Sequence, residues 1–118
     1  VSSHTIIELH PQILERLNAW AVGKSNVTII EGDWANLSLL STYDGIFIDT
    51  YGDDNWSDFK DFALAKVKSG AKITYWNNFT DKRNEHNFDS VSFDDISVTP
   101  DDNTYFTSST YNMPKVEL

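Results

Sequence analysis

Short apolar runs alternate with polar turns and with helical patterns along most of this chain. Four runs rich in β-branched or aromatic residues predict strands, and these runs cover residues 4–9, 27–30, 43–48 and 71–76. After the first run, Pro11 stands where a helix can begin, and apolar residues then recur at helical spacing until Gly23. A second helix is predicted over residues 56–67, before the helix-breaking Gly70.

The remaining sequence has a different pattern. Residues 77–87 are polar and loop-like, and two further strand patterns follow at 90–99 and 104–113, with Pro-Asp-Asp-Asn at 100–103 between them. This predicts an antiparallel hairpin. Alternating strands and helices closed by a hairpin predict an α/β three-layer sandwich, whose sheet is mostly parallel and has an antiparallel C-terminal edge. We expect a single domain over residues 1–118.

Composition narrows the classes of function. The 118 residues are 40% apolar, which argues against disorder. The net charge of −9 argues against nucleic acid as a partner, because phosphate binding depends on clustered Lys and Arg. No cysteine, no signal peptide and no apolar run of membrane-spanning length is present. We therefore expect a cytoplasmic protein that binds a small molecule rather than a membrane, and homo-oligomerisation stays open.

Two of the predicted strands end on a carboxylate. Glu8 follows the first apolar run, and Asp49 follows the run Ile46-Phe47-Ile48. In open α/β sheets, ligands bind beyond the carboxyl ends of the strands, so the two acids suggest a pocket for hydroxyls or cations. Each acid also has a purely local interpretation. Glu8 could be a solvated acid before a helix, and Asp49 could cap the next helix.

Several stretches together resemble class I S-adenosylmethionine-dependent methyltransferases, and more narrowly the guanidinoacetate and arginine N-methyltransferases. The most specific stretch is Asp44-Gly45-Ile46-Phe47-Ile48-Asp49-Thr50-Tyr51. The other matching stretches are His4-Thr5-Ile6-Ile7-Glu8, Ile13-Leu14-Glu15-Arg16-Leu17, Glu31-Gly32-Asp33-Trp34 and Thr74-Tyr75-Trp76-Asn77. The resemblance implies a Rossmann-like fold, S-adenosylmethionine as cofactor, and N-methylation of a small guanidino compound.

One departure from that family concerns its glycine-rich turn. Such enzymes open with a strand and a glycine-rich turn around the methionine part of the cofactor, and this chain has no G-x-G. In the family's strand order, the corresponding strand lies between those at 4–9 and 43–48. We therefore expect a fold that is incomplete at its N-terminus. A preceding segment, another chain or a rearranged sheet would then fill the gap.

The resemblance assigns the cofactor to the first strand ends. Glu8 would accept hydrogen bonds from the ribose hydroxyls, with Leu9 and His10 along the adenosine. The turn of Gly32, Asp33 and Trp34 would lie beside the adenine. The local alternatives stay open here: His10 could have only a structural role before Pro11, Asp33 could cap a short helix, and Trp34 could belong to the core.

The resemblance assigns the methyl acceptor to the later strand ends. Asp49 would bind the guanidinium and act as the catalytic residue, with Thr50 and Tyr51 shaping the pocket. Asn77, Asn78 and Phe79 would contact the acceptor, although Asn78-Phe79-Thr80 departs from the family's usual residues. An ordinary turn at Asn77 is the alternative.

No sequence pattern predicts a metal site. The acidic residues after Asp49 lack the glycine and terminal glutamate of a calcium loop, and the three histidines lack zinc-ligand spacing. Two other functions remain open beside the guanidino methyltransferase. One is a different adenosyl-binding transferase on the same fold, such as an aminopropyl transferase. The other is a non-catalytic domain or oligomer subunit.

Overall fold

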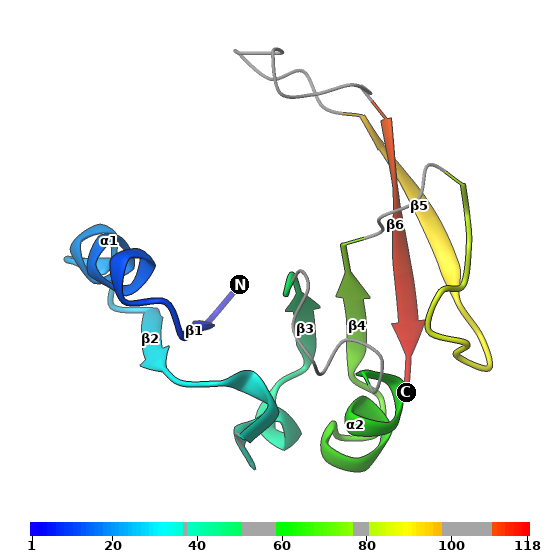
Figure 1. Cartoon of the computed structure of the whole chain (residues 1–118), viewed down its shortest axis with the longest axis horizontal. Coiled ribbons are helices and arrows are strands. Elements are labelled where there is room, and N and C mark those ends of the chain that lie inside the picture. The colour runs from blue at the N-terminus through cyan, green and yellow to red at the C-terminus, as the bar shows by residue number, and fades with distance from the viewer. Residues whose placement is uncertain (37, 51–58, 77–80, 98–109) are drawn as a thin grey trace. The chain divides into compact units, whose positions relative to one another are not determined.

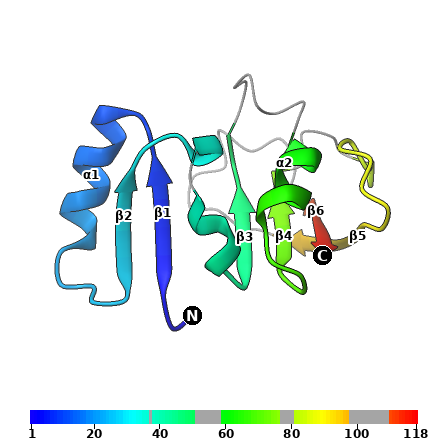
Figure 2. The same ribbon diagram turned by 90° about the horizontal axis from the view of Figure 1, so that it is seen from below.

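The structure is a computed structural model that describes residues 1–36, 38–50, 59–76, 81–97 and 110–118. The chain forms two compact units, Val1–Ser38 and Leu39–Leu118, and each is described by itself. Figures 1 and 2 show their ribbons in two views.

The first unit is a parallel strand–helix–strand unit. Strand β1 (His4–Glu8) leads into helix α1 (Pro11–Ala21) and then strand β2 (Val27–Glu31). The two strands pair in parallel from His4 beside Val27 to Glu8 beside Glu31. Helix α1 lies along β2 (Figure 2). All three elements lie where the apolar pattern predicted them, which confirms that part of the sequence interpretation.

The ends of helix α1 follow from two residues. Pro11 occupies the first helical position, where its missing N–H costs nothing, and His10 precedes it in an extended conformation. Gly23 has a φ of 79°, a left-handed conformation that lets the chain turn back towards β2. Within the helix, Leu14 is the buried residue, so the core of this unit is small.

The second unit carries a four-stranded mixed sheet. After the short 3-10 helix η2 (Ser38–Thr42) come β3 (Gly45–Ile48), α2 (Phe59–Lys66), β4 (Lys72–Tyr75), β5 (Ser92–Ser97) and β6 (Thr110–Glu117). The strand order is β3-β4-β6-β5 (Figure 1). Strands β3 and β4 are parallel, whereas β6 is antiparallel to both of its neighbours. The predicted α/β class with a C-terminal antiparallel hairpin is confirmed.

The details of the hairpin differ from the sequence prediction. The last strand was expected to end at Met113, but β6 continues through Pro114 to Glu117. Pro114 has no N–H to donate, and it lies where β6 pairs with β5 alone, before β4 joins at Val116. The structure pairs Asp95 with Asn112, a register that the sequence pattern did not specify.

The core of the second unit lies on one face of this sheet. Because side chains alternate between faces, the register places Ile48, Ile73, Tyr75 and Val116 together, and all four are buried. The loop of residues 84–89 adds Phe88, whose ring stacks on Tyr75 with centroids 6.4 Å apart. The buried face therefore combines strand residues with an irregular loop.

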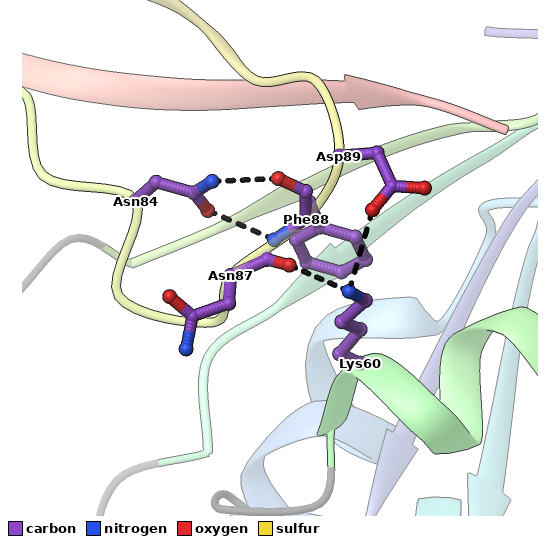
Figure 3. A network of polar contacts seen from close by, with 5 residues as sticks. All are labelled: Lys60, Asn84, Asn87, Phe88 and Asp89. Atoms are coloured by element: carbon purple, nitrogen blue, oxygen red, sulfur yellow. Dashed lines mark hydrogen bonds and ion pairs between the residues drawn. The ribbon is translucent and has the colours of Figure 1, made fainter.

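Three polar side chains hold that loop in place (Figure 3). The amide of Asn84 accepts a hydrogen bond from the Phe88 N–H at 3.1 Å and donates one to the Phe88 carbonyl at 2.7 Å. From helix α2, Lys60 donates to the Asn87 carbonyl at 2.6 Å and lies 3.6 Å from the Asp89 carboxylate. The loop is thus closed on itself by Asn84 and attached to α2 by Lys60.

None of the described helices is both long and apolar enough to cross a membrane.

Candidate functional site

The first candidate region is the carboxyl edge of β1 and β2. The Glu8 carboxylate accepts hydrogen bonds at Oε1 from the backbone N–H groups of Leu9, at 2.8 Å, and His10, at 2.7 Å. The Gly32 N–H donates to the Glu8 carbonyl at 3.0 Å, which holds the turn after β2 against the end of β1. The fold therefore brings the predicted cofactor residues Glu8, Leu9, His10 and Gly32 to one edge.

Asp33 and Trp34 extend this edge. Asp33 Oδ1 accepts a hydrogen bond from the Ala35 N–H at 2.9 Å, at the start of the 3-10 helix η1 (Trp34–Asn36). The capping role left open by the sequence is therefore real. It engages one carboxylate oxygen of Asp33, so the same side chain retains a second acceptor. Trp34 is half-buried, which fits neither a fully buried core residue nor an exposed one.

Leu9 and His10 are exposed at the turn between β1 and α1. His10 makes no capping hydrogen bond with its side chain, although its carbonyl accepts the first helical hydrogen bonds from Ile13 and Leu14. The structural role of His10 is thus carried by its backbone. Its imidazole and the Leu9 side chain are accessible at the same edge as the Glu8 carboxylate.

The second candidate region is the carboxyl edge of β3 and β4. Asp49 is exposed directly after β3. The Trp76 N–H donates to the Ile48 carbonyl at 3.2 Å, which closes the last pair of the parallel ladder, Ile48 beside Tyr75, and makes Asp49 and Trp76 the next residue on each strand. Thr50 is not helical, so Asp49 does not cap a helix that starts at the next residue. Within the described residues the Thr50 hydroxyl is buried without a hydrogen-bond partner.

Four predicted acceptor-binding residues, Tyr51, Asn77, Asn78 and Phe79, lie outside the described residues.

A buried polar cluster next to this edge was missed by the sequence analysis. His86 packs edge-on against Tyr75, the last residue of β4, with ring centroids 4.7 Å apart. The Glu85 Oε1 atom lies 3.9 Å from His86 Nε2. The sequence pattern predicted a polar loop over residues 77–87, because a run of charged and amide residues carries no signal of burial. An available signal was the pair of aromatic residues His86 and Phe88 within that polar run.

Burial perturbs the titration of this cluster. It raises the pKa of Glu85, against an opposing effect of Arg83, and it lowers the pKa of His86. Burial, with a smaller contribution from the Glu85 charge, raises the pKa of Tyr75 to about 12. At neutral pH His86 and Tyr75 are therefore uncharged, and the buried face contains no imidazolium.

Among the described residues, no group of three or more His, Cys, Asp or Glu is placed to hold a metal ion.

Comparison with solved structures defines the class of fold. The chain superposes on the yhhF protein of Escherichia coli, which is named as a methyltransferase, with a TM-score of 0.60 and 10% identity, over 100% of this chain and 66% of that one. It also superposes on precorrin-6y C5,15-methyltransferase of Geobacter metallireducens with a TM-score of 0.62 and 20% identity, over 94% of this chain and 64% of that one. The chain therefore has the Rossmann-like methyltransferase fold.

Sequence comparison gives a more particular relative. The chain is 38% identical to protein arginine N-methyltransferase 2 of Yarrowia lipolytica over an alignment of 68 residues, which covers 52% of this chain and 14% of that protein. No protein-family model matches the chain. The chain thus spans about one seventh of this curated relative and nearly two thirds of each solved structure.

Proposed function

We propose that this protein is an S-adenosylmethionine-dependent N-methyltransferase that acts on a small guanidino compound, such as guanidinoacetate or arginine. The methyltransferase fold and the partial similarity to an arginine N-methyltransferase support the class. The observation that carries the choice of acceptor is Asp49, an exposed carboxylate at the end of a parallel strand. Ligands bind at such strand ends in α/β sheets.

The residues at the edge of the first unit fit the nucleoside part of the cofactor. A ribose diol needs hydrogen-bond acceptors, and Glu8 offers a carboxylate whose Oε1 is fixed by two backbone N–H groups. No hydrogen bond from the described residues reaches Oε2, which we assign to the ribose. The second carboxylate oxygen of Asp33 would accept a hydrogen bond from the adenine amino group, and Trp34 would pack on the ring. Leu9 and His10 would line the adenosine.

Asp49 would hold the acceptor. A guanidinium pairs with a carboxylate through two parallel hydrogen bonds, which fixes both its position and its plane. Thr50 would help to shape this pocket, because its hydroxyl is enclosed next to Asp49 without a partner among the described residues. The predictions for Tyr51, Asn77, Asn78 and Phe79 as further acceptor contacts stand unchanged.

The chemistry that we propose for these residues consists of orienting the acceptor and accepting one proton. The cofactor supplies an electrophilic methyl group on a positively charged sulfur. Asp49 would orient the acceptor nitrogen towards that methyl group and accept the proton that the nitrogen loses as the new N–C bond forms. The acceptor is bound as a cation, and the proton that its nitrogen loses passes to Asp49. The scheme therefore includes no metal ion.

A methyl-transfer assay tests the proposal. The protein is incubated with S-adenosylmethionine carrying a labelled methyl group and with guanidinoacetate, arginine or a polyamine. We expect label in the guanidino compounds, and we expect Asp49→Asn to lower kcat/KM by about 10- to 150-fold, since hydrogen bonds to charged groups contribute about 1.5–3 kcal/mol. Asp44→Asn is the matched control, because Asp44 is an exposed acid at the other end of β3 that pairs with Lys68.

Three outcomes would contradict the proposal. Transfer to polyamines but not to guanidino compounds would indicate another adenosyl-dependent transferase. Failure to bind S-adenosylmethionine at all would indicate a non-catalytic domain. Equal activity of the Asp49→Asn and Asp44→Asn variants would remove Asp49 from the site.

A further inference from the structure

One face of the sheet in the second unit carries exposed aromatic side chains at the same edge as Asp49. In a sheet, residues directly opposite each other on neighbouring strands point to the same side. The ladder ends with Ile48 beside Tyr75, and Asp49 and Trp76 are the next residues along the two strands. Because side chains alternate along an extended chain, these two residues follow on the face opposite the buried Ile48 and Tyr75. Adjacent strands lie about 4.8 Å apart, so Asp49 and Trp76 start from neighbouring positions on one surface.

A second aromatic ring adjoins Trp76. Tyr111 of strand β6 lies with its ring centroid 5.3 Å from that of Trp76, and the two rings are inclined at 44°. Trp76 is 36% exposed, and Tyr111 is half-buried. Ile96, opposite Tyr111 on strand β5, extends the apolar surface and is 44% exposed. Two rings and one carboxylate thus occupy one face at the carboxyl edge of β4.

We propose that Trp76 and Tyr111 form an aromatic wall that binds a planar, delocalised cation held on its other side by Asp49. The choice of ligand rests on the proposed function, and the wall assigns two further residues to acceptor recognition. Aromatic faces attract cations, most strongly for Trp, and a guanidinium also stacks on a ring in a way that an ammonium does not. The wall would therefore favour guanidino compounds over primary amines.

The wall lies outside the buried core of this unit. The core of this unit is on the opposite face, where Ile73, Tyr75 and Val116 are almost completely buried. Elsewhere in this chain a cation already binds an indole in this way, because Lys24 Nζ lies 4.6 Å from the ring centroid of Trp20.

Ligand titration with matched variants tests the wall. The affinity of arginine and of its uncharged ureido analogue citrulline is measured by calorimetry, with S-adenosylhomocysteine present. We expect Trp76→Leu to weaken arginine binding by about 2- to 30-fold, since cation–π contacts contribute about 0.5–2 kcal/mol, and to leave citrulline binding nearly unchanged. Trp76→Phe should lose less, and Tyr111→Leu should weaken arginine binding in the same sense. Trp20→Leu is the control for loss of an exposed indole.

The results separate the wall from the proposed function. If the wild-type protein methylates arginine but Trp76→Leu and Tyr111→Leu bind it as the wild type does, the wall is refuted and the methyltransferase stands. If arginine binds in a Trp76-dependent manner without methyl transfer, the wall stands and the proposed reaction falls. Equal losses for arginine and citrulline would indicate a packing role and would also refute the wall. Should Trp76→Leu fail to fold, as judged by circular dichroism, Tyr111→Leu decides alone.

Discussion

At the scale of single residues, the acids at the strand ends have a local role that leaves room for the binding role proposed for them. Glu8 uses Oε1 to accept two backbone hydrogen bonds, and Asp33 uses Oδ1 to cap a 3-10 helix. In each case the local bonds fix the carboxylate and engage one oxygen. A local capping role and a ligand-binding role are therefore compatible for the same carboxylate, because a carboxylate has two oxygens and several lone pairs.

The prediction at this scale concerns Glu8. In Glu8→Gln the amide oxygen can still accept from Leu9 and His10, so the turn should be preserved while the charge is lost. Because charge-assisted hydrogen bonds are about twice as strong as neutral ones, we expect the affinity for S-adenosylhomocysteine to fall by about 5- to 20-fold. Calorimetric titration measures this loss. Glu31→Gln, at the paired position of β2, should bind nearly as the wild type does, and an equal loss in both variants would argue against ribose binding by Glu8.

At the scale of elements, the loop of residues 84–89 carries much of the order next to β4. Its backbone is closed by the two hydrogen bonds of Asn84, and Asn87 adopts a positive φ of 54°. Phe88 and His86 reach from this loop to Tyr75 at the end of β4. The loop therefore links helix α2, through Lys60, to the strand that leads into the candidate acceptor site.

Removing the Asn84 amide should weaken this link. Asn84→Ala leaves a backbone N–H and a carbonyl of Phe88 without their partner, so we expect the free energy of unfolding to fall by about 1–3 kcal/mol. Asn87→Gly is the control in the same loop, because glycine adopts a positive φ without strain and should be neutral or slightly stabilising. Urea denaturation of both variants measures the difference. Equal stability of the wild type and Asn84→Ala would show that the loop does not depend on this amide.

The buried His86 predicts a dependence of stability on pH. Burial lowers the pKa of His86 in the folded state below its ordinary value of 6.5. As the pH falls below 6.5, this histidine is therefore protonated more readily in the unfolded chain than in the folded one. Folding stability should therefore fall as the pH drops below 6.5. Glu85 acts in the opposite sense, since its raised pKa means that the folded state takes up a proton first as the pH falls towards 4.5.

A comparison of variants isolates the histidine. His86→Phe keeps a ring against Tyr75 and removes the ionisable group, so its stability should decline less than that of the wild type between pH 7.5 and 5.5. Thermal unfolding over this pH range, with Glu85→Gln as a second variant, measures the two contributions. Parallel curves for the wild type and His86→Phe would contradict the assigned burial of the imidazole.

Much of the element structure follows from sequence pattern, and the exceptions have physical reasons. Runs of β-branched residues located β1 to β4 to within a few residues, and Pro11 and Gly23 marked the ends of α1. The register of β5 against β6 could not be deduced, because register depends on which side chains reach the core, and Pro114 hid the continuation of β6 from the sequence pattern. The Glu85–His86 cluster was missed because polar residues carry no signal of burial in an irregular loop.

At the scale of the whole molecule, alternating strands and helices were sufficient to predict the α/β class. They were not sufficient for the order β3-β4-β6-β5, because the insertion of β6 between β4 and β5 is a long-range pairing. The candidate site was predicted at the strand ends Glu8 and Asp49, which the structure places at the carboxyl edges of their sheets. The wall of Trp76 and Tyr111 could not be predicted, because it depends on that same pairing.

The central claim is our proposal that Asp49 binds the guanidino acceptor of a methyl transfer from S-adenosylmethionine. The most direct test is the calorimetric affinity of arginine, with S-adenosylhomocysteine present, for the wild type, for Asp49→Asn and for the control Asp44→Asn. We predict that Asp49→Asn weakens arginine binding by at least about tenfold and that Asp44→Asn binds arginine as the wild type does. Arginine binding that survives unchanged in Asp49→Asn would contradict the account.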